Sequence, residues 1–254
     1  MLRLEDLSIH RGTLCVADKL CAEFQRGKVY AILGPNGAGK SSLLSTLFAE
    51  LSFKGKISFK DEILSFSNHF AWKKKIAYMP QDSSVDASLS ALEVVLLGLL
   101  DSLGMVLSDE QIRKALEIMD GLGILHLADK DILNLSGGQR QMVMFASVLI
   151  KSPEILLLDE PVSALDMHHQ CVLLESVRKS TYEKGLLTIM ILHDLSLAAQ
   201  FADEILILHD AKIRAKGEAK EVLKRDIIEP IYRVRADIFK DDDGKPIVLA
   251  KAAI

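Results

Sequence analysis

A glycine-rich segment near the start of the chain combines residue types that can bind phosphate groups. Residues 34–41 read Gly-Pro-Asn-Gly-Ala-Gly-Lys-Ser and fit the pattern G-x-x-x-x-G-K-[ST]. Glycines let successive backbone N–H groups turn inward around a phosphate, while Lys40 can reach its oxygens and Ser41 can ligate Mg²⁺. The segment follows an apolar run and precedes a helical pattern, so it predicts a nucleotide phosphate site rather than an ordinary glycine turn.

Two adjacent carboxylates follow another apolar run. Asp159 and Glu160 come directly after Ile155–Leu158, and groups at the carboxyl end of a buried strand are well placed to bind ligands. Asp159 is predicted to hold Mg²⁺ through water, which leaves Glu160 free to orient and deprotonate an attacking water molecule. Two solvated acids at a strand end are the alternative, and the phosphate loop upstream argues against it.

A pair of glycines begins a predicted helix further along the chain. Ser136 can cap a helix that starts at Gly137, with Gln139 at its third position. Two glycines in a first turn, Gly137 and Gly138, cost about 1 kcal/mol each relative to alanine, which suggests that something approaches the backbone closely there. A phosphate at the helix N-terminus is the natural candidate, and a simple capped helix start is the alternative.

The elements that must position these groups alternate between strands and helices. Apolar spacing predicts strands before the glycine-rich segment, ending in the run Val29–Leu33, and again at Lys54–Phe59. A helix is expected from Lys40, and the short apolar runs Leu187–Leu192 and Ile205–Leu208 are typical of buried parallel strands. The order of these patterns predicts a layered α/β domain.

Helical character replaces the strand pattern from about Ser83 to Asp131. Within this stretch, Ser108 and Gln111 form a capping box with an apolar stripe behind it. We therefore expect a helical insert in the α/β domain. Near the end of the chain, residues 241–245 carry three successive aspartates and a glycine, and a solvated hairpin turn is expected there rather than a calcium loop.

Composition and charge exclude several classes of protein. The chain has 254 residues, of which 49% are hydrophobic and 26% charged, so it can bury a core and is not disordered. A net charge of −4 gives no global attraction to nucleic acid or to an anionic membrane. Three cysteines without a C-x-x-C pair indicate neither a disulfide framework nor a zinc site, and they fit a reducing cytoplasm. No secretion signal and no membrane span are expected, since the apolar stretch Val94–Leu100 is too short.

The three motifs, in this order, resemble those of ATP-binding cassette (ABC) ATPases over nearly the whole chain. The resemblance implies an α/β P-loop NTPase cassette with a RecA-like core, an N-terminal antiparallel β subdomain and a helical subdomain insert. It also implies one domain, with core segments at residues 1–82 and 154–225, a helical subdomain at 83–153 and a C-terminal appendix at 226–254. ATP and Mg²⁺ are the implied cofactors. The implied nucleotide-binding residues are Gly34, Pro35, Asn36, Gly37, Ala38, Gly39, Lys40, Ser41 and Ser42 of the phosphate loop and Ser136, Gly137, Gly138 and Gln139 of the signature motif.

By the same resemblance, three further residues join Glu160 in catalysis. Gln81 is identified as the Q-loop residue and a Mg²⁺ ligand, Asp166 as the D-loop aspartate, and His193 as the switch histidine. His193 ends an apolar run, so it should emerge at the same sheet edge as Asp159 and reach the γ-phosphate. The alternatives are a surface amide for Gln81, a helix cap for Asp166 and a satisfied core histidine for His193.

One position departs from the family pattern. Where an aromatic residue usually stacks on adenine, this chain has Arg11, whose planar guanidinium can also stack. Base stacking on an aromatic side chain contributes about 1 to 3 kcal/mol, and part of this is expected to be lost. ATP and GTP should therefore differ little in affinity.

The resemblance also implies partners. ABC cassettes of this type form a head-to-tail dimer, with each ATP between one chain's phosphate loop and the other chain's signature motif. The segments Leu165–Gln170, His193–Ser196 and Ile228–Leu249 further resemble importers of ferric siderophores, haem and cobalamin, and a ferric siderophore is the expected cargo. The implied partners are a second copy, a membrane permease and, indirectly, a substrate-binding protein, without nucleic acid, at the cytoplasmic face of the inner membrane. A soluble non-transport ABC ATPase and a nucleotide-gated regulator without catalysis are the alternatives.

Overall fold

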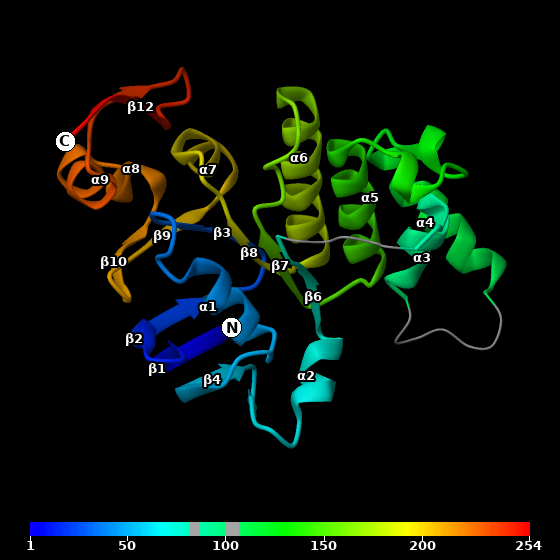
Figure 1. The fold of residues 1–254 in the computed structure, drawn as a ribbon, viewed down its shortest axis with the longest axis horizontal. Helices are drawn as coiled ribbons and strands as arrows, with labels where there is room; N and C mark the ends of the chain where they lie inside the picture. Colours follow the sequence, from blue (N-terminus) through cyan, green and yellow to red (C-terminus); the bar gives the residue numbers. More distant parts are fainter. Residues whose placement is uncertain (82–86, 100–106) are drawn as a thin grey trace.

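Two β-sheets, a group of helices and a C-terminal hairpin make up the chain (Figure 1). The structure, a computed structural model, describes residues 1–81, 87–99 and 107–254. The strands are β1 (Leu2–Arg11), β2 (Leu14–Phe24), β3 (Lys28–Leu33), β4 (Phe53–Phe59), β5 (Glu62–Ile63), β6 (Ile76–Met79), β7 (Ile155–Asp159), β8 (Leu187–Ile191), β9 (Glu204–His209), β10 (Lys212–Gly217), β11 (Val234–Lys240) and β12 (Pro246–Ala253). The helices are α1 (Lys40–Leu47), α2 (His69–Lys74), α3 (Ala91–Leu97), α4 (Asp109–Gly121), α5 (Gly137–Ile150), α6 (Met167–Lys184), α7 (Leu195–Phe201), α8 (Ala219–Val222) and α9 (Arg225–Tyr232), with short 3₁₀ turns η2 (Leu125–Leu127) and η3 (Ile132–Asn134).

The larger sheet has six strands in the order β10-β9-β3-β8-β7-β6. Strands β6, β7, β8, β3 and β9 run parallel, and β10 pairs antiparallel with β9 at one edge. This confirms the prediction of buried parallel strands. Parallel strands present their carboxyl ends at one edge of a sheet, so the residues that follow β3, β6, β7 and β8 are gathered there.

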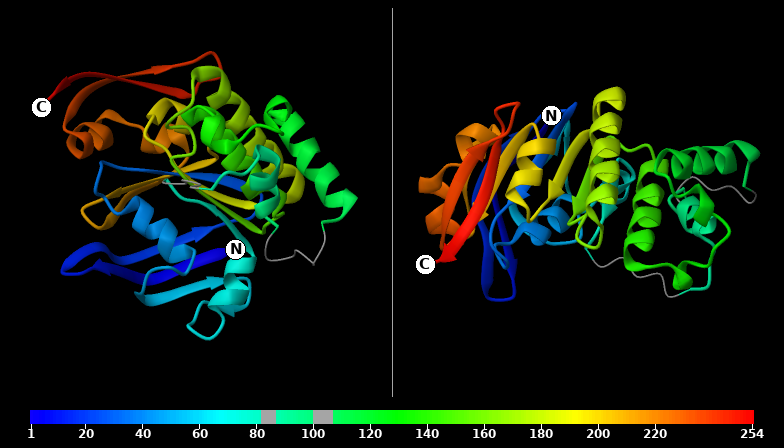
Figure 2. Two further views of the ribbon diagram at one scale, coloured as in Figure 1. Left: turned by 45° about the vertical axis from the view of Figure 1, so that its right-hand side comes forward. Right: turned by 90° about the horizontal axis from the view of Figure 1, so that it is seen from above.

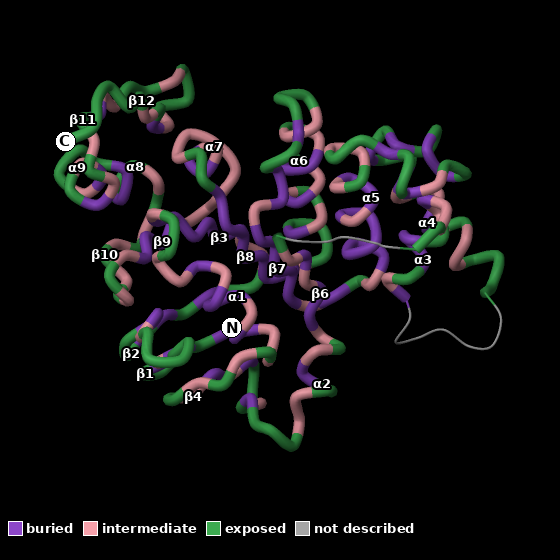
Figure 3. Tube along the Cα trace, in the orientation of Figure 1, coloured by how far each residue is buried: buried purple, intermediate pink, exposed green. Residues whose placement is uncertain are grey.

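Both faces of the six-stranded sheet are covered. Along β3, Val29, Ala31 and Leu33 contact a core shared with α3 to α9, whereas Tyr30 and Ile32 contact a second core shared with α1 and the antiparallel sheet. Figure 3 shows the strands of this sheet as a largely buried band through the molecule. Burial on both faces explains why these strands are continuous apolar runs instead of alternating polar and apolar residues.

The N-terminal strands form the smaller sheet, in the order β2-β1-β4-β5 with antiparallel pairing throughout. Leu2, Leu4, Leu7 and Ile9 of β1 point into the core that α1 shares with both sheets. The predicted N-terminal antiparallel sheet is therefore confirmed. Because α1 packs between the two sheets, the phosphate loop that precedes it lies between them as well.

The helices α3, α4 and α5 lie at one end of the molecule, opposite the C-terminal hairpin (Figure 2). The predicted capping box is present: Gln111 donates its backbone N–H to Ser108 Oγ at 3.2 Å, and Ser108 donates its own to Gln111 Oε1 at 3.0 Å. The start of the predicted helical stretch at Ser83, and the domain boundary beside it, lie outside the described residues. The division of the chain at residues 82, 153 and 225 stays a prediction.

The strands β11 and β12 form a hairpin that packs against α7. Ser196 of α7 accepts a hydrogen bond from Val248 N at 3.1 Å, and Lys245 donates to Gln200 O at 2.7 Å. The connecting turn is the expected aspartate-rich one, in which Asp241 Oδ1 accepts from Lys245 N at 2.7 Å. Within the described residues, no helix combines the length and apolar character needed to cross a bilayer.

Candidate active site

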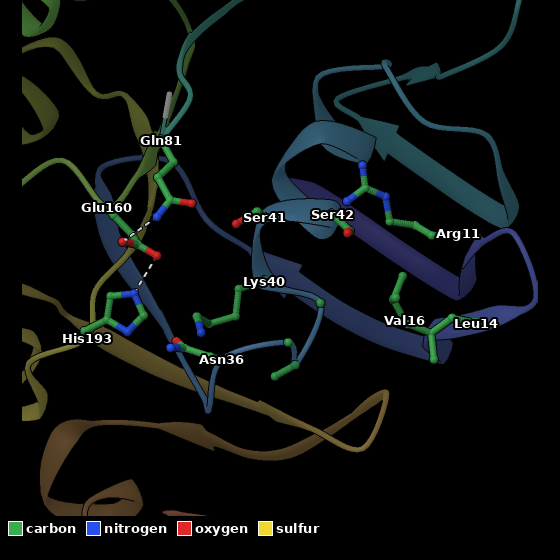
Figure 4. A pocket seen from close by; sticks show the side chains of 13 residues that line it. Arg11, Leu14, Val16, Asn36, Lys40, Ser41, Ser42, Gln81, Glu160 and His193 are labelled. Carbon is green, nitrogen blue, oxygen red and sulfur yellow. Dashed lines mark hydrogen bonds and ion pairs between the residues drawn. The ribbon is translucent and has the colours of Figure 1, made fainter. Parts of the chain in front are cut away.

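A cavity of about 440 Å³ lies at the carboxyl edge of the six-stranded sheet, a volume suited to a small-molecule ligand (Figure 4). It is lined by Arg11, Leu14, Val16, Asn36, Gly37, Ala38, Gly39, Lys40, Ser41, Ser42, Gln81, Glu160 and His193. The sequence predicts all of these except Leu14 and Val16. The fold thus brings together the phosphate loop, the Q-loop glutamine, one acid of the carboxylate pair and the switch histidine.

The phosphate loop connects β3 to α1, and two of its glycines are required by close contacts. Gly39 has φ 92°, and a Cβ atom on it would collide with the carbonyl group of Val16 in β2. A Cβ atom on Gly34 would likewise collide with the carbonyl group of Leu208 in β9. Since no other residue lacks Cβ, the loop can lie this close to both sheets only with glycine at these positions.

Lys40, the first residue of α1, is buried beneath the loop. Its ammonium group donates hydrogen bonds to the carbonyl oxygens of Gly34 at 2.8 Å and Pro35 at 3.0 Å. Burial lowers the pKa of Lys40, while the carboxylates of Glu160 and Asp159 act in the opposite direction. The ammonium group is therefore held at the center of the loop, where an anion would meet it.

Asp159 ends β7 and is only 2% exposed. Its side chain makes a hydrogen bond with Ser41, and its pKa is raised, chiefly because the carboxyl group is buried. Among the described residues, its Oδ1 atom has no hydrogen-bond partner. A buried oxygen without a partner is energetically unfavourable, and a hard cation would satisfy it. Ser41 and Asp159 thus fit a Mg²⁺ site.

Glu160 contacts two of the predicted catalytic residues. Its Oε1 atom lies 2.5 Å from Nε2 of His193, and its Oε2 atom accepts a hydrogen bond from Nε2 of Gln81 at 3.0 Å (Figure 4). The three residues follow β7, β8 and β6, which are neighbours in the sheet. The prediction that His193 emerges at the edge occupied by Asp159 is confirmed, since Asp159 pairs with Ile191.

Within the described part of the chain, other predicted site residues do not line the cavity. Ser136 to Gln139 form a capped start of α5, in which Gln139 donates its backbone N–H to Ser136 Oγ at 3.2 Å. Packing within the chain itself favours glycine at position 138, because a Cβ atom there would lie 3.0 Å from the carbonyl oxygen of Ala164. Asp166 is the exposed cap of α6 and accepts from His169 N at 2.9 Å. The helix caps considered as alternatives are therefore present.

Three contacts near the cavity are not predicted by sequence patterns. Leu14 and Val16 of β2 add an apolar wall beside Arg11, and their place on the same hairpin is the signal that could have found them. Gln141 of α5 hydrogen-bonds the backbone of Glu160. Tyr232, at the end of α9, hydrogen-bonds the backbone of Gly34. The last two lie far along the chain from their partners, and no local pattern marks them.

Comparison with known proteins places the chain in a family. Residues 17–163 match the ABC transporter family. The hemin import ATP-binding protein HmuV of Pseudomonas fluorescens is 36% identical over 99% of this chain and 100% of the relative. The ferric enterobactin transport ATP-binding protein FepC of Escherichia coli is 36% identical over 98% of this chain and 93% of the relative.

The fold is also found among solved structures. An ABC transporter of metal-chelate type, in an inward-facing conformation, matches with a TM-score of 0.83 and 23% identity, over 98% of this chain and 97% of the other. This likeness confirms the predicted ABC cassette fold, including its α/β architecture. Because the family match covers more than half of the chain and the relatives match over nearly all of it, this chain belongs to the ABC transporter family as one of its ATP-binding proteins.

Proposed function

We propose that the chain is the ATP-hydrolysing subunit of an importer that takes up a metal chelate through a separate membrane permease. The observation that carries this proposal is the meeting of the phosphate loop with Glu160, His193 and Gln81 in one cavity. The named relatives import hemin and transport ferric enterobactin, so we take the cargo to be an iron chelate, either a ferric siderophore or haem.

The phosphates of ATP bind on the loop before α1. The backbone N–H groups at the start of a helix and its partial positive charge favour an anion there. Lys40 is already aimed into the loop, and its bonds within the described residues go to neutral carbonyl oxygens. Because a charged phosphate oxygen is a stronger acceptor than a carbonyl oxygen, Lys40 exchanges these bonds for the β- and γ-phosphates when ATP binds.

Ser41, Asp159 and Gln81 hold Mg²⁺ in this proposal. Two observations support the first two ligands. Ser41 and Asp159 are joined by a hydrogen bond, and Oδ1 of Asp159 has no partner among the described residues. Gln81 bonds Glu160 in this structure, and its amide oxygen is free of that bond. Bound Mg²⁺ supplies positive charge that neutralises the phosphate oxygens.

Glu160 is the general base for hydrolysis. A carboxylate that does not ligate the metal can orient a water molecule and accept its proton as the water attacks the γ-phosphate. His193 and Gln81 hold the two oxygens of Glu160 from opposite neighbouring strands, which restricts the direction of the carboxylate. His193 also lines the cavity itself and is placed to contact the γ-phosphate.

The second half of the site comes from another copy of the chain. Ser136 and Gly137 are exposed at the N-terminus of α5, apart from the cavity of their own chain. In a head-to-tail dimer, this exposed helix N-terminus binds the phosphates held by the partner's loop. Asp166, exposed in the same region, acts at this dimer interface.

The remaining partners are a permease dimer and, indirectly, a substrate-binding protein. The chain works at the cytoplasmic face of the inner membrane, where the permease anchors it. We further propose the division into core segments at residues 1–82 and 154–225, a helical subdomain between them and an appendix from residue 226, because the helices α3 to α5 and the C-terminal hairpin lie at opposite ends of the molecule.

The Glu160→Gln variant tests the catalytic assignment, because it retains the shape of the side chain but cannot accept the proton. Turnover of MgATP should fall by about 100-fold or more, while the affinity for ATP stays within about twofold of wild type. Glu175→Gln, at an exposed position of α6, is the matched control and should leave both unchanged. Turnover at the native rate in Glu160→Gln would show that Glu160 is not the base.

Uptake measurements test the transport assignment. A strain that lacks this gene should lose uptake of a radioiron-labelled siderophore or of hemin, and the wild-type gene should restore it while the Glu160→Gln gene should not. The chain should also co-purify with a membrane permease. Unchanged uptake of both chelates, together with no permease in the purified material, would contradict import and favour a soluble ABC ATPase.

A further inference from the structure

The proposed catalytic base has an unusual backbone conformation. Glu160 has φ 52°, in the left-handed region that residues with a side chain rarely adopt. Such a conformation persists where surrounding contacts hold it. The direction of the Glu160 carboxylate therefore depends on whatever holds its backbone.

Among the residues that the structure describes, three hydrogen bonds hold the carbonyl oxygen of Glu160. Two come from Ser163, through Oγ at 3.2 Å and the backbone N–H at 3.3 Å. The third comes from Nε2 of Gln141 at 3.1 Å. Ser163 lies three residues further along the same loop and moves with it, whereas Gln141 belongs to α5. Gln141 is thus the contact that ties this backbone to another element.

The other end of the same amide group also contacts the loop. Oε1 of Gln141 accepts a hydrogen bond from Ala164 N at 3.0 Å. One half-buried side chain therefore bonds both ends of the loop 160–164. Gly138, one turn earlier in α5, packs directly on the carbonyl oxygen of Ala164, so the first turns of α5 and this loop form one closely packed unit.

We propose that Gln141 is a positioning residue for hydrolysis, which holds the backbone of Glu160 and ties it to the first turn of α5. This inference rests on the proposed function, in which Glu160 is the base and Ser136 to Gln139 bind the nucleotide of a second copy. Gln141 lies in α5 just after that signature motif. When α5 moves as its N-terminus binds the partner's nucleotide, Gln141 therefore moves the backbone of Glu160, the catalytic base of its own chain.

Two substitutions separate the two hydrogen bonds. Gln141→Leu has a similar size and removes both bonds. Gln141→Glu keeps an oxygen that accepts from Ala164 but places another oxygen against the carbonyl oxygen of Glu160, where they repel. Gln170→Leu is the matched control, because Gln170 of α6 donates to Val162 O at 3.3 Å and Leu165 O at 3.1 Å, in the segment between β7 and α6, and neither bond involves Glu160.

The measured quantities are kcat and KM for MgATP, together with the melting temperature. Both Gln141 variants should lose about tenfold or more in kcat, with KM within about twofold, because a displaced base slows the chemical step without weakening ATP binding. Gln170→Leu should keep kcat within about twofold. If Gln141→Leu proves too unstable to assay, the isosteric Gln141→Glu gives the same comparison.

A double variant distinguishes positioning from a general structural role. With the base removed, Gln141 has nothing left to position, so Glu160→Gln/Gln141→Leu should have the same single-turnover rate as Glu160→Gln alone. Native kcat in both Gln141 variants, an equal loss in Gln170→Leu, or a further loss in the double variant would each overturn the inference. Native turnover in Glu160→Gln would instead overturn the proposed function on which it rests.

Discussion

Tyr232, the last residue of α9, hydrogen-bonds the backbone of Gly34, the first residue of the phosphate loop. Its ring packs against the core that also contains Leu33 at the end of β3. The carbonyl oxygen of Gly34 accepts a further bond from Lys40. The C-terminal segment therefore contacts the start of the phosphate loop at Gly34, the residue that also accepts a hydrogen bond from Lys40.

The Tyr232→Phe variant should bind ATP about two- to fivefold more weakly, because a single hydrogen bond contributes about 1 kcal/mol. The phosphate loop would be held less firmly, which weakens ATP binding. The catalytic base Glu160 would keep its contacts, so kcat should change little. Equilibrium titration with ATP measures the effect. Tyr182→Phe is the control. It also removes a phenol hydroxyl that makes a hydrogen bond, to Asp203 Oδ1 at 2.8 Å and away from the loop, and it should leave the affinity for ATP unchanged.

The same tyrosine predicts a dependence of stability on alkaline pH. Burial raises the pKa of Tyr232 to about 12 from its ordinary value of 10.0. Between these values the unfolded chain loses the phenol proton while the folded chain keeps it, so the free energy of unfolding falls as the pH rises. Urea denaturation at about pH 8 and about pH 11 measures this decrease in the free energy of unfolding. The decrease should be smaller by about 1 kcal/mol in Tyr232→Phe than in wild type. An equal decrease in both proteins would contradict this origin.

Asp159→Asn should stabilise the chain without nucleotide and weaken the effect of Mg²⁺ on its melting temperature. The substitution removes the charge of a buried side chain whose Oδ1 atom has no partner among the described residues. A gain of about 1 kcal/mol raises the melting temperature by roughly 2–4 °C in a chain of this size. Added MgATP should raise the melting temperature of wild type more than that of the variant, because only the wild type keeps the Asp159 carboxylate among the proposed ligands. Thermal denaturation with ATP plus EDTA, compared with MgATP, measures both effects. A variant that responds to Mg²⁺ as wild type does would exclude Asp159 as a ligand.

Arg11 and Leu14 line the part of the cavity where the adenine ring of ATP is expected to lie. Neither offers an aromatic face, so the affinities for ATP and GTP should differ by less than about tenfold. Arg11→Tyr should bind ATP up to about tenfold more tightly through stacking on the base. Arg3→Tyr, on the same strand but paired with Glu23 at 3.0 Å outside the cavity, is the control and should bind as wild type does. A wild-type preference for ATP above tenfold would refute the prediction.

Predictions that depend on nearby residues agree with the structure. The capping boxes at Ser108 with Gln111 and at Ser136 with Gln139 each join residues one helical turn apart, so their geometry follows from local backbone conformation. The same holds for the loop after β3, whose glycine pattern is needed by the turn it makes. Because these contacts involve only neighbours in the chain, residue type and spacing are enough to predict them.

Predictions about the shared edge of the sheet required one further assumption, that the apolar runs are parallel strands. Given that, His193 must emerge beside Asp159, and it does. Gln81 joins them because it follows β6, which pairs with β7 and which the sequence patterns did not predict as a strand. The hydrogen bond from Gln81 to Glu160 does not follow from this reasoning, because several donors at a strand edge can reach one carboxylate. Which donor does so depends on side-chain rotamers.

The sequence by itself determined the phosphate loop, the carboxylate pair and the alternation of strands and helices, because these depend on residue type and on periods of two or nearly four residues. Only the tertiary structure decided that Gln141 holds Glu160, that Tyr232 supports Gly34 and that Ser136 to Gln139 lie outside their own cavity. The physical reason is that such contacts are set by which elements become neighbours on folding, and side-chain packing across the core selects those neighbours from many that the local patterns allow.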